Sequence, residues 1–293
     1  MAEWGLQSMT AGGDDRGGAT DIRSAVPAAD DIAAGTAIGH YRIEGRLGAG
    51  GMGVVYRAVD VRLNRPVAIK FLSADLLDAA ARERFRREAQ TASALNHPHI
   101  LTVHDVGEHA GREYLVTELV DGGTLAEWAE GVHGRRDWRR IVELLVGVGD
   151  GLAAAHAAGI LHRDVKPANV LVSKSGHAKL ADFGLAKSVN DGAPRTSHTA
   201  AGVAIGTVAY MSPEQAAGAR LDARSDVFAF GALLYELLEG RAPFSGRNDL
   251  EIMQSILHSA PRPLSDDLPE ALRTLVDKSL EKDPAERYQT MRD

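Results

Sequence analysis

Hydrophobic positions change their spacing twice along the chain. Residues 1–38 are rich in Gly, Ala and Asp, contain Trp4 as their one aromatic residue, and show neither a period of two nor one of 3.6 residues. We expect a disordered leader here, because such a segment has too little apolar surface to offset the entropy of ordering. From Tyr41 onward, short β-rich runs are separated by turns that contain Gly and Asn, a pattern typical of an antiparallel sheet.

Five runs predict strands, and one longer stretch between them predicts a helix. The strand-like runs cover residues 41–48, 53–60 and 65–72, and two more that a polar turn joins within 100–120. Residues 79–95 have a helical period that places Phe85, Ala92 and Leu95 on one face. Glu88 is a charge on this otherwise apolar stripe. Residues 39–120 are therefore expected to form a five-stranded antiparallel unit with one main helix.

The helical period predominates after residues 121–124, which we expect to be a hinge. It covers residues 141–159, 225–240, 248–258 and 271–281. The second of these stretches is apolar on nearly every side, which indicates a buried helix. The last residues, 286–293, resemble the start of a helix that is cut short. The pattern predicts a mostly helical unit over 121–293 whose final helix is incomplete.

Composition restricts the function more than the fold. A chain of 293 residues with 44% hydrophobic and 25% charged residues is ordinary for a globular protein, and a formal charge of −7 argues against nucleic acid as the main partner. The absence of cysteine excludes disulfides, a thiolate nucleophile and a Cys-based zinc site. No apolar run approaches the roughly 20 residues that span a bilayer. We expect a cytoplasmic protein, or the cytoplasmic domain of a longer membrane-anchored one.

Chemistry is concentrated in one stretch, HRDVKPANVLVSKSGHAKLADFG, at residues 162–184. Asp164 can accept the proton of an attacking hydroxyl, while Asn169 and Asp182 supply the hard oxygen ligands that Mg²⁺ prefers. The pattern H-R-D-x4-N is expected by chance on the order of 10⁻³ times in such a chain. Together with D-F-G it resembles the signatures of the protein kinases.

The resemblance covers the chain from Tyr41 to its end and implies a fold and an activity. The fold is α+β and bilobal: a five-stranded antiparallel N-lobe with one main helix at 39–120, and a mostly helical C-lobe at 121–293. The K-P-A-N form after the base, and the run GTVAYMSPEQ, resemble bacterial serine/threonine kinases. By resemblance Asp164 is the catalytic base, and Lys166 steadies the transferred phosphate.

A glycine-rich run lies seventeen residues before a lysine that resembles the kinases' phosphate-binding lysine. Gly48, Gly50 and Gly53 follow one predicted strand and precede the next, so their backbone could approach nucleotide phosphates; a tight hairpin turn is the alternative. Lys70 is a cation on an otherwise apolar strand. By resemblance it binds the phosphates of ATP, with Glu88 as its ion-pair partner. A solvated lysine and a solvated glutamate are the alternative for this pair.

The resemblance also implies an adenine site. The backbone of Glu118 and Val120 would meet the ring edge after Thr117, a small residue that borders the back of the pocket. Apolar side chains would sandwich the ring, although each of them would suit a plain core equally well. They are Leu47, Val55, Ala68 and Leu171.

Regulatory and structural residues are implied in the same way. Between Asp182 and Glu214 the chain offers Thr199, Ser197 and Thr196, in that order of preference, as phosphorylation sites, although Ser and Thr also populate plain loops. Arg163 is a fitting bidentate partner for such a phosphate. By resemblance Glu214 pairs with Arg287, Thr207 packs beside the base, and Asp226 accepts hydrogen bonds from the catalytic-loop backbone. Asp226 by its position could also cap its helix, and both roles can hold together. His162 has apolar neighbours, so we expect it to be packed and hydrogen-bonded rather than a proton shuttle.

The sequence as a whole predicts a serine/threonine protein kinase of bacterial type. It would transfer the γ-phosphate of ATP, with Mg²⁺ or Mn²⁺, to Ser and Thr hydroxyls of protein substrates and of its own activation loop. A homodimer would suit phosphorylation between copies. A binding module that keeps the fold without transfer is one rival, but every catalytic residue is present. A small-molecule phosphotransferase is the other, and it usually lacks the long segment that ends here in Pro213 and Glu214.

Overall fold

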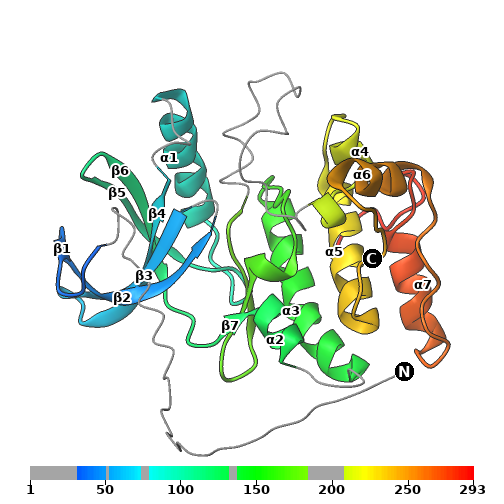
Figure 1. Ribbon diagram of the computed structural model, residues 1–293, viewed down its shortest axis with the longest axis horizontal. Coiled ribbons are helices and arrows are strands. Elements are labelled where there is room, and N and C mark those ends of the chain that lie inside the picture. The colour runs from blue at the N-terminus through cyan, green and yellow to red at the C-terminus, as the bar shows by residue number, and fades with distance from the viewer. Residues whose placement is uncertain (1–31, 51–52, 74–78, 132–136, 184–207) are drawn as a thin grey trace, which may run out of the picture.

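The computed structural model describes most of the chain, in two lobes. The described residues are 32–50, 53–73, 79–131, 137–183 and 208–293. In Figure 1 the strands of the first lobe lie on one side and most helices on the other, joined near β7.

The elements that the sequence predicts occur in the predicted order, except for the last helix, and short elements that it does not predict lie among them. The strands are β1 (Ala37–Ile38), β2 (Tyr41–Gly50), β3 (Gly53–Asp60), β4 (Arg65–Leu72), β5 (Val103–His109), β6 (Arg112–Glu118), β7 (Gly123–Thr124), β8 (Val170–Val172) and β9 (Ala178–Leu180). The α-helices are α1 (Ala79–Ser93), α2 (Leu125–Glu130), α3 (Trp138–Ala157), α4 (Pro213–Ala216), α5 (Ala223–Glu239), α6 (Asp249–His258) and α7 (Glu270–Ser279). Short 3-10 turns cover Pro167–Asn169 and Val208–Tyr210.

The N-lobe sheet is antiparallel and has six strands in the order β1-β2-β3-β4-β6-β5. The extra strand is β1, whose two residues pair with the start of β2. It lies within the segment expected to be a disordered leader. Ile38 is nevertheless 1% exposed, and the backbone N–H of Ile32 donates to the Tyr56 hydroxyl. The described chain therefore packs on the sheet earlier than residue 39.

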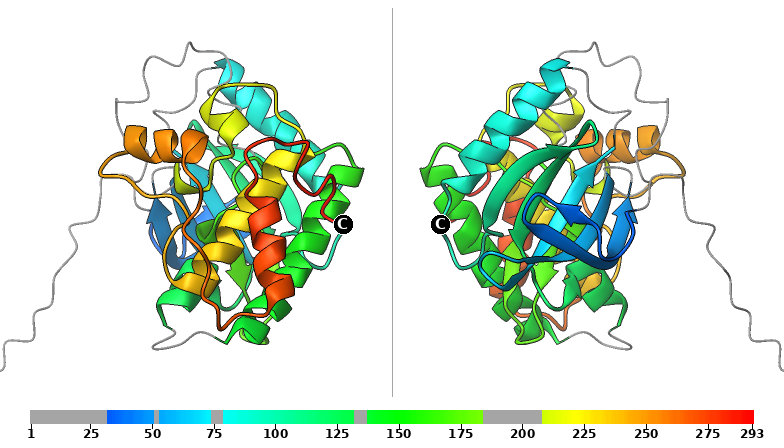
Figure 2. Two further views of the ribbon diagram at one scale, coloured as in Figure 1. Left: turned by 90° about the vertical axis from the view of Figure 1, so that its right-hand side faces the viewer. Right: turned by 90° about the vertical axis from the view of Figure 1, so that its left-hand side faces the viewer.

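Strand β4 shows how alternation places a charged residue. Val67, Ile69 and Phe71 are fully buried in the core on one face of the sheet, so Ala68 and Lys70 point to the other face. Helix α1 covers that second face, where Phe85 packs with Leu115, the residue opposite Lys70 in β6. Figure 2 shows α1 crossing the sheet. Lys70 therefore lies on the face of the sheet that α1 covers, and the core residues of β4 lie on the opposite face.

The first residue of β3 has to be glycine. Gly53 has φ +136°, and a Cβ there would lie 1.8 Å from the carbonyl oxygen of Phe71. By contrast, a Cβ on Gly48 or Gly50 would meet no heavy atom within 4 Å. The close pairing of β3 with β4 therefore explains Gly53 but neither of the other two glycines.

Gly53→Ala should lower the free energy of unfolding by at least about 1–3 kcal/mol, because the strained backbone is combined with a clash. Gly48→Ala is the matched control and should leave stability nearly unchanged. Urea denaturation of both variants measures the difference. Equal stability of the two variants would contradict the packing argument.

The C-lobe is built around two long helices. Helix α3 begins at the N-cap Asp137, and α5 begins at the N-cap Asp222 and ends at Gly240, whose φ of +72° suits glycine. Both bury most of their length in one hydrophobic core, and α5 packs beside α7 (Figure 2). Asp226 lies one turn inside α5, so its expected role as the N-cap is wrong. The expected start of a final helix at 286–293 is also not observed, because these residues form turns.

A small sheet of β7, β8 and β9 lies at the junction of the lobes. The segment before β5 is attached to it by two backbone hydrogen bonds of 2.8 Å, from Leu101 N to Leu180 O and from Leu180 N to His99 O. Strands β8 and β9 follow and precede the loops that carry the predicted catalytic residues. The junction therefore fixes both loops relative to the N-lobe.

Candidate active site

A buried carboxylate binds the backbone of the loop at residues 162–169. Asp226 of α5 is 1% exposed and accepts hydrogen bonds of 2.8 Å from the backbone N–H groups of both His162 and Arg163. It also accepts one of 2.7 Å from His156 Nε2 on α3. The expectation that Asp226 binds the catalytic-loop backbone is confirmed. Arg163 has φ +64°, so the loop includes a backbone conformation that needs such support.

His162 is structural, as expected. Its side chain is fully buried, packs against the Phe183 ring at 4.7 Å between centroids, and lies 3.0 Å from the Ala181 carbonyl through Nε2. Burial lowers the pKa of His162 despite the nearby aspartates, so the ring remains neutral near pH 7. A neutral ring donates to the carbonyl and accepts from the N–H of Asp164. It thereby links the loop to the residue before Asp182.

Asp164 lies at the centre of a small polar cluster. Its Oδ2 accepts hydrogen bonds of 2.8 Å from Asn169 Nδ2 and is 2.8 Å from Lys166 Nζ. Asn169 Nδ2 also donates to the Asp164 carbonyl, which fixes the loop across its turn. The Asp164 side chain is 8% exposed. Three of the predicted site residues are thus brought into direct contact.

Asp182 meets Lys70 across the lobes. Lys70 Nζ lies 2.6 Å from Asp182 Oδ2, and Asp182 itself has φ +59°. The partner expected for Lys70 is Glu88, which lies on α1; its side chain is outside the described residues. The N-lobe strand and the C-lobe loop are therefore joined directly at this pair.

Asn169 and Asp182, the predicted metal ligands, lie just before β8 and just after β9. The two segments are joined by a hydrogen bond of 2.8 Å from Ala181 N to Asn169 O. Within the described residues, no group of three or more His, Cys, Asp or Glu side chains is arranged to hold a metal ion. One carboxylate and one amide leave most positions of an octahedral ion to water and substrate phosphates, the usual situation for Mg²⁺. The donor set fits Mg²⁺ in that sense.

Two of the predicted adenine walls, Val55 and Ala68, lie on the same face of the N-lobe sheet as Lys70. Val55 faces Lys70, and Ala68 faces Thr117, in the strand registers. Val55, Ala68, Val120 and Leu171 are partly exposed, and Leu47 is 52% exposed. None of these side chains belongs to the fully buried core.

Glu118 has a role that the sequence did not indicate. Its carboxylate accepts hydrogen bonds of 2.8 Å from Lys179 Nζ of β9 and from Thr102 N, and its own N–H donates to the Thr102 carbonyl. Although burial raises the pKa of Glu118, these hydrogen bonds outweigh it and hold the pKa below the ordinary value. The end of β6 is thus attached to the small sheet of the other lobe.

Four contacts outside the catalytic cluster connect distant parts of the chain, and the sequence predicted one of them. The ion pair of Glu214 and Arg287 is confirmed, with 2.8 Å between Arg287 Nη1 and Glu214 Oε1. His156, Lys179 and Gln215 were missed, because each acts through a partner more than fifty residues away. The candidate phosphorylation sites Thr196, Ser197 and Thr199, and Thr207, lie outside the described residues.

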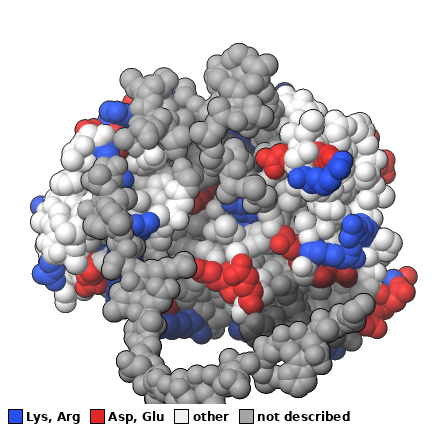
Figure 3. Space-filling view, in the orientation of Figure 1, with Lys and Arg blue, Asp and Glu red and all other residues white. Residues whose placement is uncertain are grey.

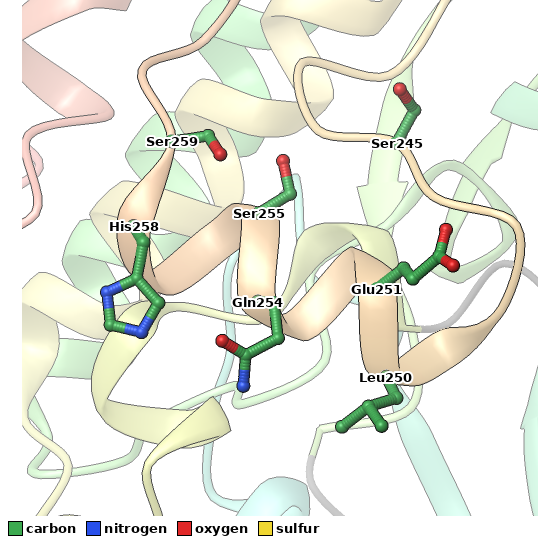
Figure 4. Close-up of a pocket in the computed structure, with 7 residues that line it drawn as sticks. All are labelled: Ser245, Leu250, Glu251, Gln254, Ser255, His258 and Ser259. Carbon is green, nitrogen blue, oxygen red and sulfur yellow. The ribbon is translucent and has the colours of Figure 1, made fainter.

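The described surface away from this cluster carries mixed charge and one open hollow. On the face seen in Figure 3, the described residues carry acidic and basic side chains interspersed rather than one broad positive field. An open hollow of about 520 Å³ lies beside α6, where Glu251, Gln254 and His258 point outward (Figure 4). No predicted site residue lines it. The chemistry of the described chain is therefore concentrated at the junction of the lobes.

Comparison with known proteins agrees with this geometry. The family model described as the protein kinase domain matches residues 41–292. The chain is 44% identical over 262 residues to a protein of Streptomyces coelicolor named as a probable serine/threonine-protein kinase, and 43% identical over 261 residues to the serine/threonine-protein kinase PknA of Mycobacterium tuberculosis. These matches cover 86% and 87% of this chain but 38% and 59% of the relatives. The crystal structure of the M. tuberculosis PknI kinase domain matches with a TM-score of 0.69 at 30% identity, over 89% of this chain and 95% of that one.

This chain belongs to the protein kinase family and has the protein kinase fold. Its close relatives are serine/threonine kinases, enzymes that act on protein substrates, and the family uses ATP and a divalent metal ion. The chain spans between about two fifths and three fifths of the length of the relatives named here. Among the helices that the structure describes, none is both long enough and apolar enough to cross a membrane.

Proposed function

We propose that the protein phosphorylates Ser and Thr hydroxyls of proteins with Mg-ATP, with Asp164 as the base. The observation that supports this best is the cluster itself. Asp164, Lys166 and Asn169 are in contact, and Lys70 and Asp182 join the N-lobe to the same site. These residue types in this arrangement suit phosphoryl transfer, where positioning and charge stabilisation supply most of the rate.

Each residue of the cluster has a separate task. Asp164 orients the acceptor hydroxyl and takes its proton, and its own carboxylate is kept in place by Asn169. Lys166, 2.8 Å from that carboxylate, is close enough to stabilise charge on the transferred group. Asn169 and Asp182 would hold Mg²⁺, which when bound screens the phosphate charge. Lys70 would orient the nucleotide phosphates, and it is kept near the site by Asp182.

The nucleotide would lie against the glycine turn and the partly exposed apolar residues. Gly48 and Gly50 are not required by the packing of the chain, since a Cβ on either would enter open space. Close approach of the backbone to phosphates explains glycine at both positions. The adenine ring would lie among Val55, Ala68 and Leu171, beside the backbone of residues 118–120.

Activation would depend on a phosphate in the segment before Glu214. Thr199 is the first candidate, Ser197 the second and Thr196 the third. Arg163 directly precedes the base and would bind the phosphate, so modification would stabilise the loop that carries Asp164.

The assay that tests the function is incubation of the purified chain with Mg²⁺ and γ-labelled ATP, alone and with a general protein acceptor, followed by mapping of the phosphates. We expect label on Ser and Thr residues. Bound ATP without any transfer would instead favour a binding module, and label on a small-molecule acceptor alone would favour the other rival.

Lys70→Met should abolish autophosphorylation and leave folding intact. The Lys70 and Asp182 side chains are 19% and 28% exposed, so water still reaches Asp182 in the variant, and losing the ion pair should cost about 1–3 kcal/mol of stability. Phosphate incorporation and thermal unfolding measure the two effects separately. Incorporation equal to that of the parent would remove Lys70 from the proposed machinery.

A further inference from the structure

Gln215 makes a contact that its place in a helix cap does not explain. It is the third residue of α4, is 8% exposed, and uses both ends of its side chain. Oε1 accepts from the Ser212 N–H at 3.0 Å, as in an ordinary capping box. Nε2 donates to the Arg163 carbonyl at 2.8 Å, across 52 residues of sequence.

That carbonyl belongs to a residue whose backbone is held on both sides. Arg163 has φ +64°, a conformation that non-glycine residues seldom adopt without support. Its N–H donates to Asp226 Oδ1 at 2.8 Å, and its carbonyl accepts from Gln215. Side chains from α5 and α4 therefore fix the two polar backbone groups of this one residue.

The peptide that begins with the Arg163 carbonyl continues with the N–H of Asp164. Because a peptide unit is planar, fixing the carbonyl also fixes the direction in which the Asp164 backbone starts. Asp164 then has its carboxylate set by Asn169 and Lys166. Displacement of a catalytic group by about 1 Å can cost on the order of a hundredfold in rate.

We propose that Gln215 is a positioning residue that sets the orientation of Asp164 and couples it to the segment ending at Ser212, Pro213 and Glu214. This inference rests on the proposed function of Asp164. It makes the end of that segment a direct support of the catalytic loop. A shift of α4 would then be transmitted to the base through one side-chain hydrogen bond.

Gln215→Glu separates this role from the helix cap. Glutamate at this position keeps an acceptor for the Ser212 N–H, but its carboxylate has no N–H to donate to Arg163. We expect kcat for a peptide acceptor to fall about ten- to a hundredfold, with KM for ATP changed by less than about twofold. Gln215→Met, which has a similar length and no donor, should lower kcat in the same way.

Ser212→Ala is the matched control. It removes the hydroxyl that accepts from Gln215 N at 3.3 Å and leaves the bond to Arg163 in place. It should lower thermal stability, and it should lower kcat much less than Gln215→Glu does, because the hydrogen bond to the Arg163 carbonyl remains. If kcat fell equally in Ser212→Ala and Gln215→Glu, the effect would be general destabilisation and the positioning role would be wrong.

Hydrogen exchange tests the contact without relying on activity. Peptides that cover residues 162–166 should exchange faster in Gln215→Glu and Gln215→Met than in the parent, and at the parent's rate in Ser212→Ala. Unchanged exchange in both Gln215 variants would overturn the inference. A parent that transfers no phosphate would overturn the proposed function, while exchange would still decide whether Gln215 supports the loop.

Discussion

Asp164→Asn should reduce the rate of phosphoryl transfer by about 10²- to 10⁴-fold, the usual contribution of a positioned base. Asparagine has the same shape and keeps one oxygen that can accept a hydrogen bond from Lys166. It cannot take the proton of the acceptor hydroxyl. The loss should therefore appear in kcat, while the affinity for ATP and the thermal stability remain close to those of the parent.

The measurement is steady-state transfer to a Ser-containing peptide, together with calorimetric titration of a non-hydrolysable ATP analogue. Asp137→Asn is the control, because Asp137 is the N-cap of α3 and asparagine caps a helix about as well as aspartate does. It should behave like the parent in both measurements. An Asp164→Asn variant with parental kcat would show that another group removes the proton.

The strands that the sequence predicted best are those with a strict alternation. Strands β3 and β4 coincide with the predicted runs 53–60 and 65–72, because alternate residues such as Val67 and Ile69 enter the core. Strand β1 was missed for a physical reason: two residues are too few to show a period. They join the sheet through backbone hydrogen bonds with β2, which any side chains allow.

The residues of the site were predicted more completely than the contacts that hold them: the contacts of Asp226 with the loop backbone and of Glu214 with Arg287 were expected, whereas that of Gln215 was not. The motifs named Asp164, Asn169 and Asp182, and the structure places them in the segments beside β8 and β9. The support beneath them depends on tertiary packing, which brings Asp226 and Gln215 to the backbone of residues 162–163. No local period encodes a side chain that meets a carbonyl dozens of residues away.

The start of α5 also shows what residue type alone does not predict. Two aspartates, Asp222 and Asp226, lie near the start of the buried helix, and both suit an N-cap by residue type. The cap is Asp222, whose side chain accepts from the Arg224 N–H, while Asp226 faces inward to the catalytic loop. Only the packing of α5 against that loop distinguishes them.

The largest effect on stability should come from Arg287. It is 2% exposed and donates to both oxygens of Glu214, at 2.8 and 2.9 Å, and to the carbonyls of Arg224, Glu281 and Lys282. Arg287→Met would leave a largely buried carboxylate and three carbonyls without this donor. We expect the free energy of unfolding to fall by about 3–5 kcal/mol, the usual cost of removing one partner of a buried pair.

Urea denaturation of the parent and the variant measures this loss. The control is Arg247→Met, which breaks an exposed ion pair with Glu251 one turn away on α6. Exposed pairs of this kind contribute little, so the control should unfold close to the parent's midpoint. Equal midpoints for Arg287→Met and Arg247→Met would contradict the role of the buried pair.

The contribution of Glu214 to stability should depend on pH differently in the parent and in Arg287→Met, because burial and hydrogen bonding shift the pKa of Glu214 in opposite directions. Burial alone raises the pKa of Glu214, but hydrogen bonds from Arg287 and Ser225 outweigh it and hold the pKa below the ordinary value. In the parent, this pair therefore stabilises the fold above the ordinary carboxyl pKa and loses that contribution as the pH falls through the lowered value. Without Arg287, burial favours the protonated carboxyl, so acid removes part of the variant's deficit. The difference in stability between parent and Arg287→Met should narrow from pH 7 toward pH 4. A difference that stayed constant over this range would show that Arg287 acts through its carbonyl contacts, which do not titrate, and not through Glu214.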